Sequence, residues 1–262
     1  MVEEKELDIL AGKVAELIVA AERVVVFSGA GISTESGISD FRGPGGIWER
    51  FNPDDFTYQK FLIDPAARRK HWQLLYEGGL TKKAQPNAAH YAIAELDRLG
   101  KLDCVITQNI DNLHQKAGVP AEKVFELHGN MQRVICLSCA RCYSTEEITL
   151  RLDKGEEIPD CEVCHGILKP AVVFFGESLP EMVLLEATNR ARRCDLCIVI
   201  GSTLVVYPAA FIPEYAVSSG ARLVIINLSP TPMDEYAAAL IRAKAGETMS
   251  RVVRQAAEKL SR

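Results

Sequence analysis

The feature that most constrains the fold of this chain is an alternation between short apolar runs and longer stretches in which apolar residues recur at helical spacing. The apolar runs have the length and composition of strands buried on both faces of a parallel sheet. They cover residues 23–27, 103–107, 195–200 and 222–227. Helical spacing covers residues 7–21, 87–99, 179–193 and 247–260. Strands that alternate with helices predict an α/β fold built on a doubly wound parallel sheet.

A glycine-rich turn follows the first apolar run. Gly29 and Gly31 come just after Phe27, and a stretch with helical spacing follows them. Glycine lets a backbone turn tightly and approach a pyrophosphate, and N–H groups at the start of a helix favour an anion. A full Gly-x-Gly-x-x-Gly fingerprint would place glycine at position 34, where this chain has Thr34. The turn therefore predicts a Rossmann-like dinucleotide site and disfavours a standard dehydrogenase, while a purely structural turn stays open.

Two cysteine pairs lie in the middle of the chain. Each pair has two residues between its cysteines, and the distance between the pairs is close to that of known four-cysteine zinc sites. The pairs are Cys136 with Cys139 and Cys161 with Cys164. Because four thiolates fill a tetrahedral shell, they predict a structural Zn²⁺ and not a catalytic one.

Neighbouring residues offer alternatives for this metal site. Cys142 extends the first pair, and His165 follows the second, so either could replace one ligand. Cys194 and Cys197 have the same spacing but enter a predicted buried strand, and Cys104 opens another. Small apolar cysteines are common in packed sheets, so we expect these three to belong to the core.

Two stretches interrupt the alternation of strands and helices. Residues 48–85 show no buried-strand pattern, and residues 133–169 hold the cysteine pairs. We predict that the helical insertion 48–85 and the zinc-binding module 133–169 together form a smaller second domain. The Rossmann-like dinucleotide-binding domain then comprises residues 1–47, 86–132 and 170–262.

Composition and charge narrow the possible partners. The chain is 48% hydrophobic and 25% charged, as in ordinary globular proteins, and its net charge is -5. An acidic balance argues against direct nucleic-acid binding and suits a basic partner such as a lysine-rich peptide. No apolar run reaches the roughly 18 residues of a membrane span, and the acidic start MVEEKELD lacks the basic region of a secretory signal. We expect a cytoplasmic protein that does not bind membranes and is a monomer.

Polar residues gather where predicted strands end. Gln108, Asn109 and Asp111 follow the run 103–107, at the edge where open α/β sheets bind ligands. For Asp111 alone, a capping or turn role is the alternative. His128 ends a short apolar segment, and an imidazole is the most common general base for activating a hydroxyl. Asn227, at the end of another predicted strand, could hold ribose hydroxyls or simply begin a turn.

Several of these segments together resemble a known family. GAGISTESGISDFRG, TQNIDNLH, HGN, VVFFGE and GSTLVVYPAA, in this order, resemble the signature blocks of the sirtuins, the NAD-dependent protein lysine deacylases. The resemblance spans residues 7 to 260 and is greatest to the bacterial and archaeal deacetylase type. It implies NAD as co-substrate, a structural Zn²⁺, and an acyl-lysine protein or peptide as substrate.

The resemblance also implies how the site works. The acyl-lysine oxygen attacks the ribose carbon that bears nicotinamide, and nicotinamide leaves. An alkylamidate forms. His128 then takes a proton from a ribose hydroxyl, which lets this hydroxyl attack the alkylamidate and release free lysine and O-acyl-ADP-ribose. Asn109 and Asp111 position the ribose and nicotinamide, and Phe41, in a loop that closes over the cofactor, keeps water from the reactive centre.

The family's cofactor contacts map onto matching positions of this chain. They are Gly29, Ala30, Gly31, Thr34, Asp40, Phe41, Arg42, Gln108, Asn109, Ile110, Asp111, Gly201, Ser202, Thr203, Asn227, Leu228, Ser229 and Ala245. The family's substrate contacts, which pair with the peptide as an added strand and line the acyl-lysine channel, map onto Val173, Phe174, Phe175, Gly176, Glu177, Val205, Val206 and Tyr207.

The helical insertion bears on the acyl group. Relatives that prefer negatively charged acyl chains carry a Tyr-x-x-Arg pair there, and its arginine binds the carboxylate. Between Asp64 and Pro86 the only tyrosine is Tyr76, and Gly79 stands three residues later. We therefore expect a short uncharged acyl group, acetyl first, while longer fatty acyl groups remain open.

Three other functions compete with deacylation. An NAD-dependent protein ADP-ribosyltransferase would use the same bond cleavage. A zinc-stabilised module that binds NAD without turnover conflicts with the combination of His128, Asn109 and Asp111. A zinc-dependent hydrolase conflicts with a metal held by four thiolates.

Overall fold

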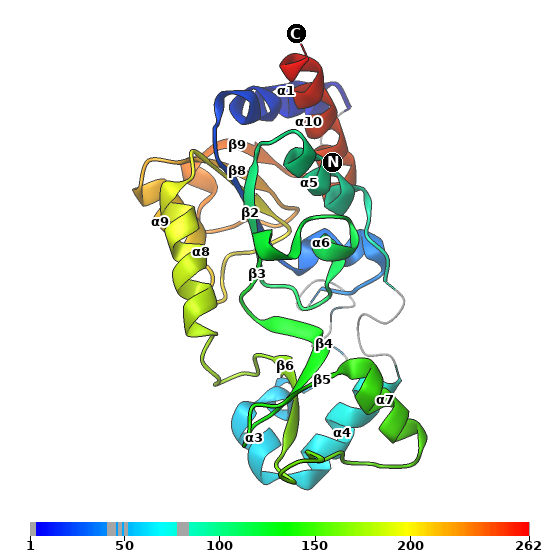
Figure 1. The fold of residues 1–262 in the computed structure, drawn as a ribbon. Coiled ribbons are helices and arrows are strands. Elements are labelled where there is room, and N and C mark those ends of the chain that lie inside the picture. Colours follow the sequence, from blue (N-terminus) through cyan, green and yellow to red (C-terminus); the bar gives the residue numbers. More distant parts are fainter. Residues whose placement is uncertain (1–3, 41–45, 47–48, 50–51, 78–83, 262) are drawn as a thin grey trace.

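A six-stranded parallel sheet forms the centre of the larger part of the molecule (Figure 1). The computed structural model describes residues 4–40, 46, 49, 52–77 and 84–261. In sheet order the strands are β3 (Val124–Glu126), β2 (Leu102–Thr107), β1 (Val24–Ser28), β7 (Leu196–Ile200), β8 (Arg222–Ile226) and β9 (Ala237–Ile241). The predicted doubly wound α/β architecture is confirmed.

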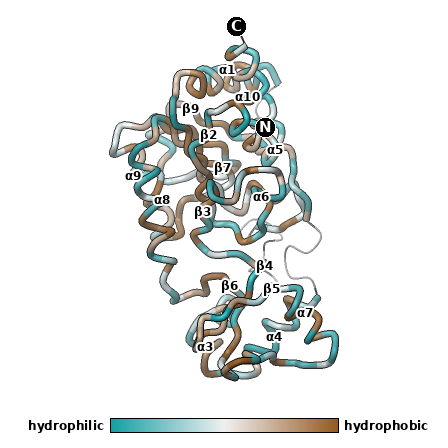
Figure 2. The backbone as a smooth tube through the Cα atoms, in the orientation of Figure 1, coloured by the Kyte–Doolittle hydropathy of each residue, from teal (hydrophilic) through white to brown (hydrophobic). Residues whose placement is uncertain are grey.

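Helices cover both faces of this sheet. One face carries α1 (Glu4–Ala20), α5 (Ala88–Arg98) and α10 (Ala245–Leu260), and the other carries α8 (Glu181–Arg193) and α9 (Phe211–Ser218). Successive residues of a strand point to opposite faces, so Val24 and Val26 of β1 pack in the first core and Val25 and Phe27 in the second. Because both faces are covered, the central strands β1 and β7 are buried along their whole length and are almost entirely hydrophobic (Figure 2).

The four strands predicted from apolar runs are the four inner strands of the sheet. The edge strands β3 and β9 were not predicted. The first is only three residues long, and the second has the sequence AAALI, in which alanine has low strand propensity. Both edge strands owe their form to pairing with β2 and β8.

A second, smaller sheet lies at the other end of the molecule (Figure 1). It is antiparallel, with the order β5 (Cys142–Ser144), β4 (Gly129–Cys136) and β6 (Leu168–Val172). The helices of this part are α3 (Tyr58–Ile63), α4 (Pro65–Tyr76) and α7 (Thr145–Asp153). The carboxylate of Asp64 caps α4 by accepting the N–H of Ala66, and Pro65 occupies its first turn. The buried Trp72 of α4 packs with Ile148 and Leu168, which joins the helical insertion to the sheet.

The remaining short elements lie in the connections. They are η1 (Ala30–Ser36), η2 (Pro53–Phe56), α6 (Leu113–Lys116), η3 (Ala121–Lys123) and η4 (Asp234–Tyr236). Among the helices of the described residues, none has the length and apolarity needed to cross a membrane.

Candidate active site

A cavity of about 930 Å³ lies at the carboxyl ends of the parallel strands. Residues that directly follow four strands line it: Gly29 after β1, Gln108 after β2, Gly201 after β7 and Asn227 after β8. Its opposite wall comes from α4 and β4 of the smaller part. The cavity therefore lies between the two parts of the molecule, at the edge where open α/β sheets bind ligands.

The glycines of the turn after β1 are required by the packing of two loops. The N–H of Gly31 donates to the carbonyl oxygen of Gly201 at 2.8 Å. A Cβ atom on Gly29 would lie 2.8 Å from that oxygen, and one on Gly31 would lie 2.7 Å from Gly201 Cα. Gly201 itself has φ +63, a left-handed conformation. The glycines thus bring the ends of β1 and β7 together and leave a bare backbone at the cavity wall.

Asn109 is fixed by the turn after β1. It is buried, and its Nδ2 donates to the carbonyl oxygen of Gly29 and to Ser33 Oγ, both at 3.2 Å. Ser33 Oγ in turn donates to the Asp111 carboxylate at 2.7 Å. Asp111 also accepts the N–H of Leu113, and it does not line the cavity. Asp111 therefore lies behind the cavity wall. It binds Ser33 directly, and it fixes Asn109 through Ser33.

A buried chain of polar groups supports the same segment. Thr107 Oγ1 accepts the backbone N–H of Asn109 at 3.0 Å and the hydroxyl of Ser28 at 2.8 Å. The Ser28 hydroxyl lies 2.8 Å from His114 Nε2. Because Ser28 donates to Thr107, His114 Nε2 is the donor in the second contact. Sequence reasoning missed this support because serine, threonine and a helical histidine carry no specific signal.

His128 lies between β3 and β4 and lines the cavity. Its Nδ1 lies 2.9 Å from the backbone oxygen of Gln108. A carbonyl oxygen only accepts, so Nδ1 carries the proton and Nε2 is the basic nitrogen of the neutral ring. Burial lowers the pKa of His128, although the hydrogen bond from Nδ1 opposes this shift. The ring is therefore neutral at pH 7 and can accept a proton.

The segment after β6 forms another wall of the cavity. Of the segment 172–177, only Val172 lies in β6, and the residues after it form an isolated bridge and a turn. The N–H of Val173 donates to the carbonyl oxygen of His128 at 2.9 Å. Phe174 is buried and stacks on His71, with 4.8 Å between ring centroids. Phe175 forms an isolated bridge with Thr57, so this wall is joined to the helical insertion.

Most of the predicted site residues meet in this one cavity. Those that line it are Gly29, Ala30, Gly31, Thr34, Asp40, Gln108, Asn109, Ile110, His128, Val173, Phe174, Phe175, Gly176, Glu177, Gly201, Ser202, Thr203, Val205, Val206, Tyr207, Asn227, Leu228, Ser229 and Ala245. Asp111 lies behind it, and Phe41 and Arg42 lie outside the described residues.

Other residues that line the cavity were not predicted. They include Glu35, His71, Leu74, Leu75, Met131 and Lys244. The three from α4 follow the spacing i, i+3, i+4 of one helix face, which was available in the sequence. That spacing does not say whether the face meets a core or a cavity. Burial lowers the pKa of His71, so this face of α4 carries no charge at neutral pH.

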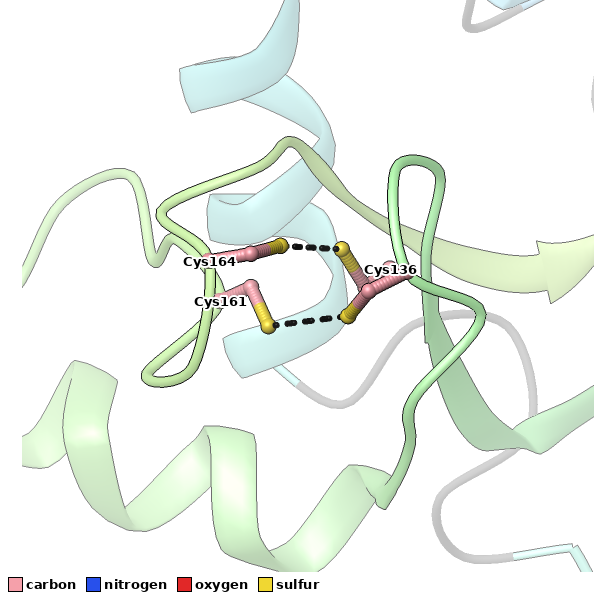
Figure 3. A group of neighbouring side chains, drawn as sticks. Cys136, Cys161 and Cys164 are labelled. Carbon is pink, nitrogen blue, oxygen red and sulfur yellow. Dashed lines mark hydrogen bonds between the residues drawn. The ribbon is translucent and has the colours of Figure 1, made fainter.

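The four cysteines of the two pairs form a cluster (Figure 3). Their sulfur atoms all lie within 4.8 Å of one another, with Cys136 Sγ 3.5 Å from Cys164 Sγ and Cys139 Sγ 3.6 Å from Cys161 Sγ. Tetrahedral Zn–S bonds of about 2.3 Å place sulfur atoms roughly 3.8 Å apart, so the cluster fits Zn²⁺. The hydroxyl of Tyr143 lies 3.2 Å from Cys161 Sγ, where it can donate to the thiolate that a metal binds.

The alternative ligands are not in this cluster. Cys142 is exposed, and His165 lies 3.4 Å from a carboxylate oxygen of Asp160. Cys194 and Cys197 are buried in the core, as predicted, and burial raises the pKa of both thiols. These two cysteines remain neutral thiols of the packed sheet.

A family model and known protein sequences match most of this chain. A model of the Sir2 family matches residues 29–208. The chain is 47% identical over 244 residues to the NAD-dependent protein deacetylase of Thermodesulfovibrio yellowstonii, which covers 92% of this chain and 93% of the relative. It is 44% identical over 245 residues to NAD-dependent protein deacylase 2 of Archaeoglobus fulgidus, covering 93% and 94%.

Solved structures of Sir2 proteins also superpose on this chain. The structure of a Sir2 enzyme superposes with a TM-score of 0.86 at 43% identity, covering 96% of this chain and 99% of the other. A Sir2 complex with p53 peptide and NAD⁺ has a TM-score of 0.83 at 39% identity, covering 93% and 97%. A further complex, with deacetylated p53 peptide and 3′-O-acetyl ADP-ribose, has a TM-score of 0.84 at 40% identity, covering 92% and 96%.

Proposed function

Because the chain belongs to the Sir2 family, we propose that it is an NAD-dependent protein lysine deacetylase that yields nicotinamide, O-acyl-ADP-ribose and free lysine. The observation that carries the proposal is a single cavity lined by His128, Asn109 and the glycine-rich turn 29–31. The relatives named as deacetylase and deacylase align over nearly their whole length. The same cavity has room for a dinucleotide and a lysine side chain.

His128 is the general base of the proposed reaction. Bound NAD would supply the ribose carbon that accepts the acyl oxygen and the hydroxyl that loses a proton. The Gln108 carbonyl fixes the ring so that Nε2 is free to take that proton. Asn109, held by Gly29 and Ser33, orients the ribose beside it. Asp111 contributes by holding this arrangement from behind.

The cofactor and the peptide occupy different walls. The dinucleotide lies along the strand ends, from Gly29 to Gly201 and Asn227, and the peptide lies between residues 173–177 and residues 205–207. An extended peptide between these two segments would be held by backbone hydrogen bonds, with its acyl-lysine directed inward. Solved Sir2 relatives with bound p53 peptide support this assignment.

The acyl group is short and uncharged in this proposal. His71, Leu74 and Leu75 are the α4 residues at the cavity, and none is cationic at neutral pH. The basic residues of α4 are held elsewhere: Arg68 by carbonyl oxygens of α3, Arg69 by Glu157 and Lys70 by Asp55. Among the described residues of α4, none therefore offers a cation to an acidic acyl chain, and acetyl-lysine is the preferred substrate.

Turnover of an acetyl-lysine peptide with NAD tests the proposal. We expect deacetylation that requires NAD and releases nicotinamide in equal amount. Replacing a general base lowers kcat by about 10²–10⁴-fold, so His128→Ala should lose turnover to that extent while NAD binding and zinc content persist. His165→Asn is the matched control, because His165 is exposed and asparagine tolerates its positive φ.

The opposite results identify the alternatives. Unchanged turnover in His128→Ala would contradict the catalytic assignment. ADP-ribose attached to protein without deacetylation of the peptide would indicate an ADP-ribosyltransferase. The cytoplasmic location and the monomeric state expected from the sequence stay predictions.

A further inference from the structure

Lys169 is a buried cation in the second position of β6. Only 3% of the residue is exposed. Its Nζ donates to the carbonyl oxygen of Val172 at 2.5 Å, to that of Pro170 at 3.3 Å and to the Glu177 carboxylate at 3.0 Å. An ammonium group has three N–H donors, so every donor is used inside the protein. The ammonium also lies over the ring of Phe174, 4.6 Å from its centroid.

Glu177 closes the turn that this cation holds. Its N–H donates to the carbonyl oxygen of Phe174 at 3.0 Å, and its carboxylate accepts the N–H of Phe174 at 2.9 Å. Gly176, the third residue of the turn, has φ +80, as a type II turn requires. One carboxylate oxygen of Glu177 thus binds both Phe174 and Lys169. Lys169 thus binds the first and the last residue of segment 172–177, Val172 and Glu177.

This segment is in contact with the proposed catalytic machinery. The N–H of Val173 donates to the carbonyl oxygen of His128, and Phe174 stacks on His71 of α4. Val173, Phe174 and Glu177 all line the cavity. A shift of the segment would therefore move the wall of the acyl-lysine channel relative to the general base.

Stability alone does not account for a charge at position 169. Burial opposes the charged form of Lys169 and lowers its pKa. Packed apolar residues of similar volume often replace a buried ion pair without loss of stability. The ion pair instead fixes the conformation of segment 172–177, because both charged groups bind backbone atoms of this segment.

We propose that Lys169 and Glu177 are positioning residues that hold segment 172–177 as the wall of the acyl-lysine channel. This inference rests on the proposed deacetylase function for the identity of the substrate. Since the dinucleotide lies along the strand ends, loss of the pair should weaken the peptide's interaction with the enzyme and leave NAD binding intact.

Steady-state kinetics of Lys169→Met test the proposal, because methionine keeps the volume and removes the charge. We expect the KM for an acetyl-lysine peptide to rise by about tenfold or more, while the Kd for NAD changes by less than about twofold. Lys169→Arg should restore much of the loss. Lys123→Met, which breaks the Lys123–Asp97 pair away from the cavity, is the matched control and should leave both values unchanged.

Glu177→Gln gives a second route if Lys169→Met does not fold. It should raise the peptide KM in the same direction. In the double variant the two effects should not add, since each removes the same interaction. A peptide KM that stays within about twofold of wild type in both single variants would overturn the proposal, as would an equal loss of NAD affinity.

An error in the proposed function would give a different result from an error in the positioning role. Wild-type protein that does not deacetylate the peptide would contradict that function and not the positioning role. Fluorescence anisotropy with a labelled acetyl-lysine peptide then reads the role directly. Weaker peptide binding in Lys169→Met supports it, and unchanged binding overturns it.

Discussion

His128 combines two properties that a general base needs at neutral pH. The hydrogen bond from Nδ1 to the Gln108 carbonyl fixes both the ring's direction and its tautomer. Burial keeps the ring neutral, because the charged form loses hydration inside the protein. The sequence indicated this residue by its type and its neighbours, but the tautomer depends on an acceptor that lies 20 positions earlier in the chain.

The pH dependence of the reaction should report this residue. The pKa of His128 lies below the ordinary value of about 6.5, so kcat/KM should be at its plateau at pH 7. It should fall as the pH drops through the lowered pKa, because protonated Nε2 no longer accepts a proton. Nicotinamide release measured from pH 5 to 8 checks this. An acid limb centred above pH 7 would contradict the assignment, and the residual activity of His128→Ala should lack the limb.

At the scale of elements, two short turns build the metal site. Cys136 and Cys139 flank a turn at the end of β4, and Cys161 and Cys164 flank the turn before β6. The backbones are held locally: the N–H of Ala140 donates to the carbonyl oxygen of Cys136, and that of His165 to the carbonyl oxygen of Cys161. The four sulfur atoms converge because β4 and β6 pair, which brings together the turns at their ends.

Loss of one ligand should therefore release the metal and loosen the small sheet. We expect Cys139→Ser to lose most of its zinc and to lose amide-exchange protection in β4 and β6, while β1, β7 and β8 keep theirs. Cys142→Ser is the matched control, since Cys142 lies outside the cluster and should keep a full zinc content. Zinc analysis and hydrogen exchange measure both effects. Equal zinc loss in the two variants, or an unchanged small sheet without metal, would contradict this role.

The division into domains is still a prediction at this scale. The predicted boundaries follow residues 47, 85, 132 and 169, whereas β4 begins at Gly129 and β6 ends at Val172. Strand pairing continues across two of these positions, because the small sheet needs the length of both strands. The connections to the large sheet therefore begin within a few residues of His128 and Val173, at the cavity itself.

For the whole molecule, buried histidines link stability to pH. Burial lowers the pKa of His71, His90, His114 and His128. In the unfolded chain these side chains bind protons near pH 6.5, but in the folded protein only at lower pH. The unfolded state therefore binds more protons in this window, and acid favours unfolding.

We expect the free energy of unfolding to fall as the pH drops from 6.5 to 5. Burial lowers the pKa of His90 to about 4, and its ring lies beside the buried His114, so this pair of histidines should account for roughly 2 kcal/mol of the fall at about 1.4 kcal/mol per pH unit. Urea unfolding at pH 7 and pH 5 measures it, and His90→Gln should show a smaller difference than wild type. Equal stability of the wild-type protein at the two pH values would contradict this expectation.

The sequence by itself determined the features that depend on local pattern. The inner strands are recognisable because a strand buried on both faces is apolar at most positions, and the metal site because two cysteine pairs have a specific spacing. The order of the motifs also identified the family, which the comparisons confirm. His128 and Asn109 could be chosen because their residue types and their positions near strand ends point to chemistry.

Only the tertiary structure decided which distant residues meet. The edge strands β3 and β9 form because a neighbouring strand offers hydrogen bonds, and His71 reaches the cavity because α4 packs against the small sheet. Asp111 lies behind the cavity wall, and Lys169 binds the turn that carries Phe174. Local periodicity tells which side chains are buried, but not what they are buried against. That depends on contacts between segments far apart in the chain, which packing of the whole molecule sets.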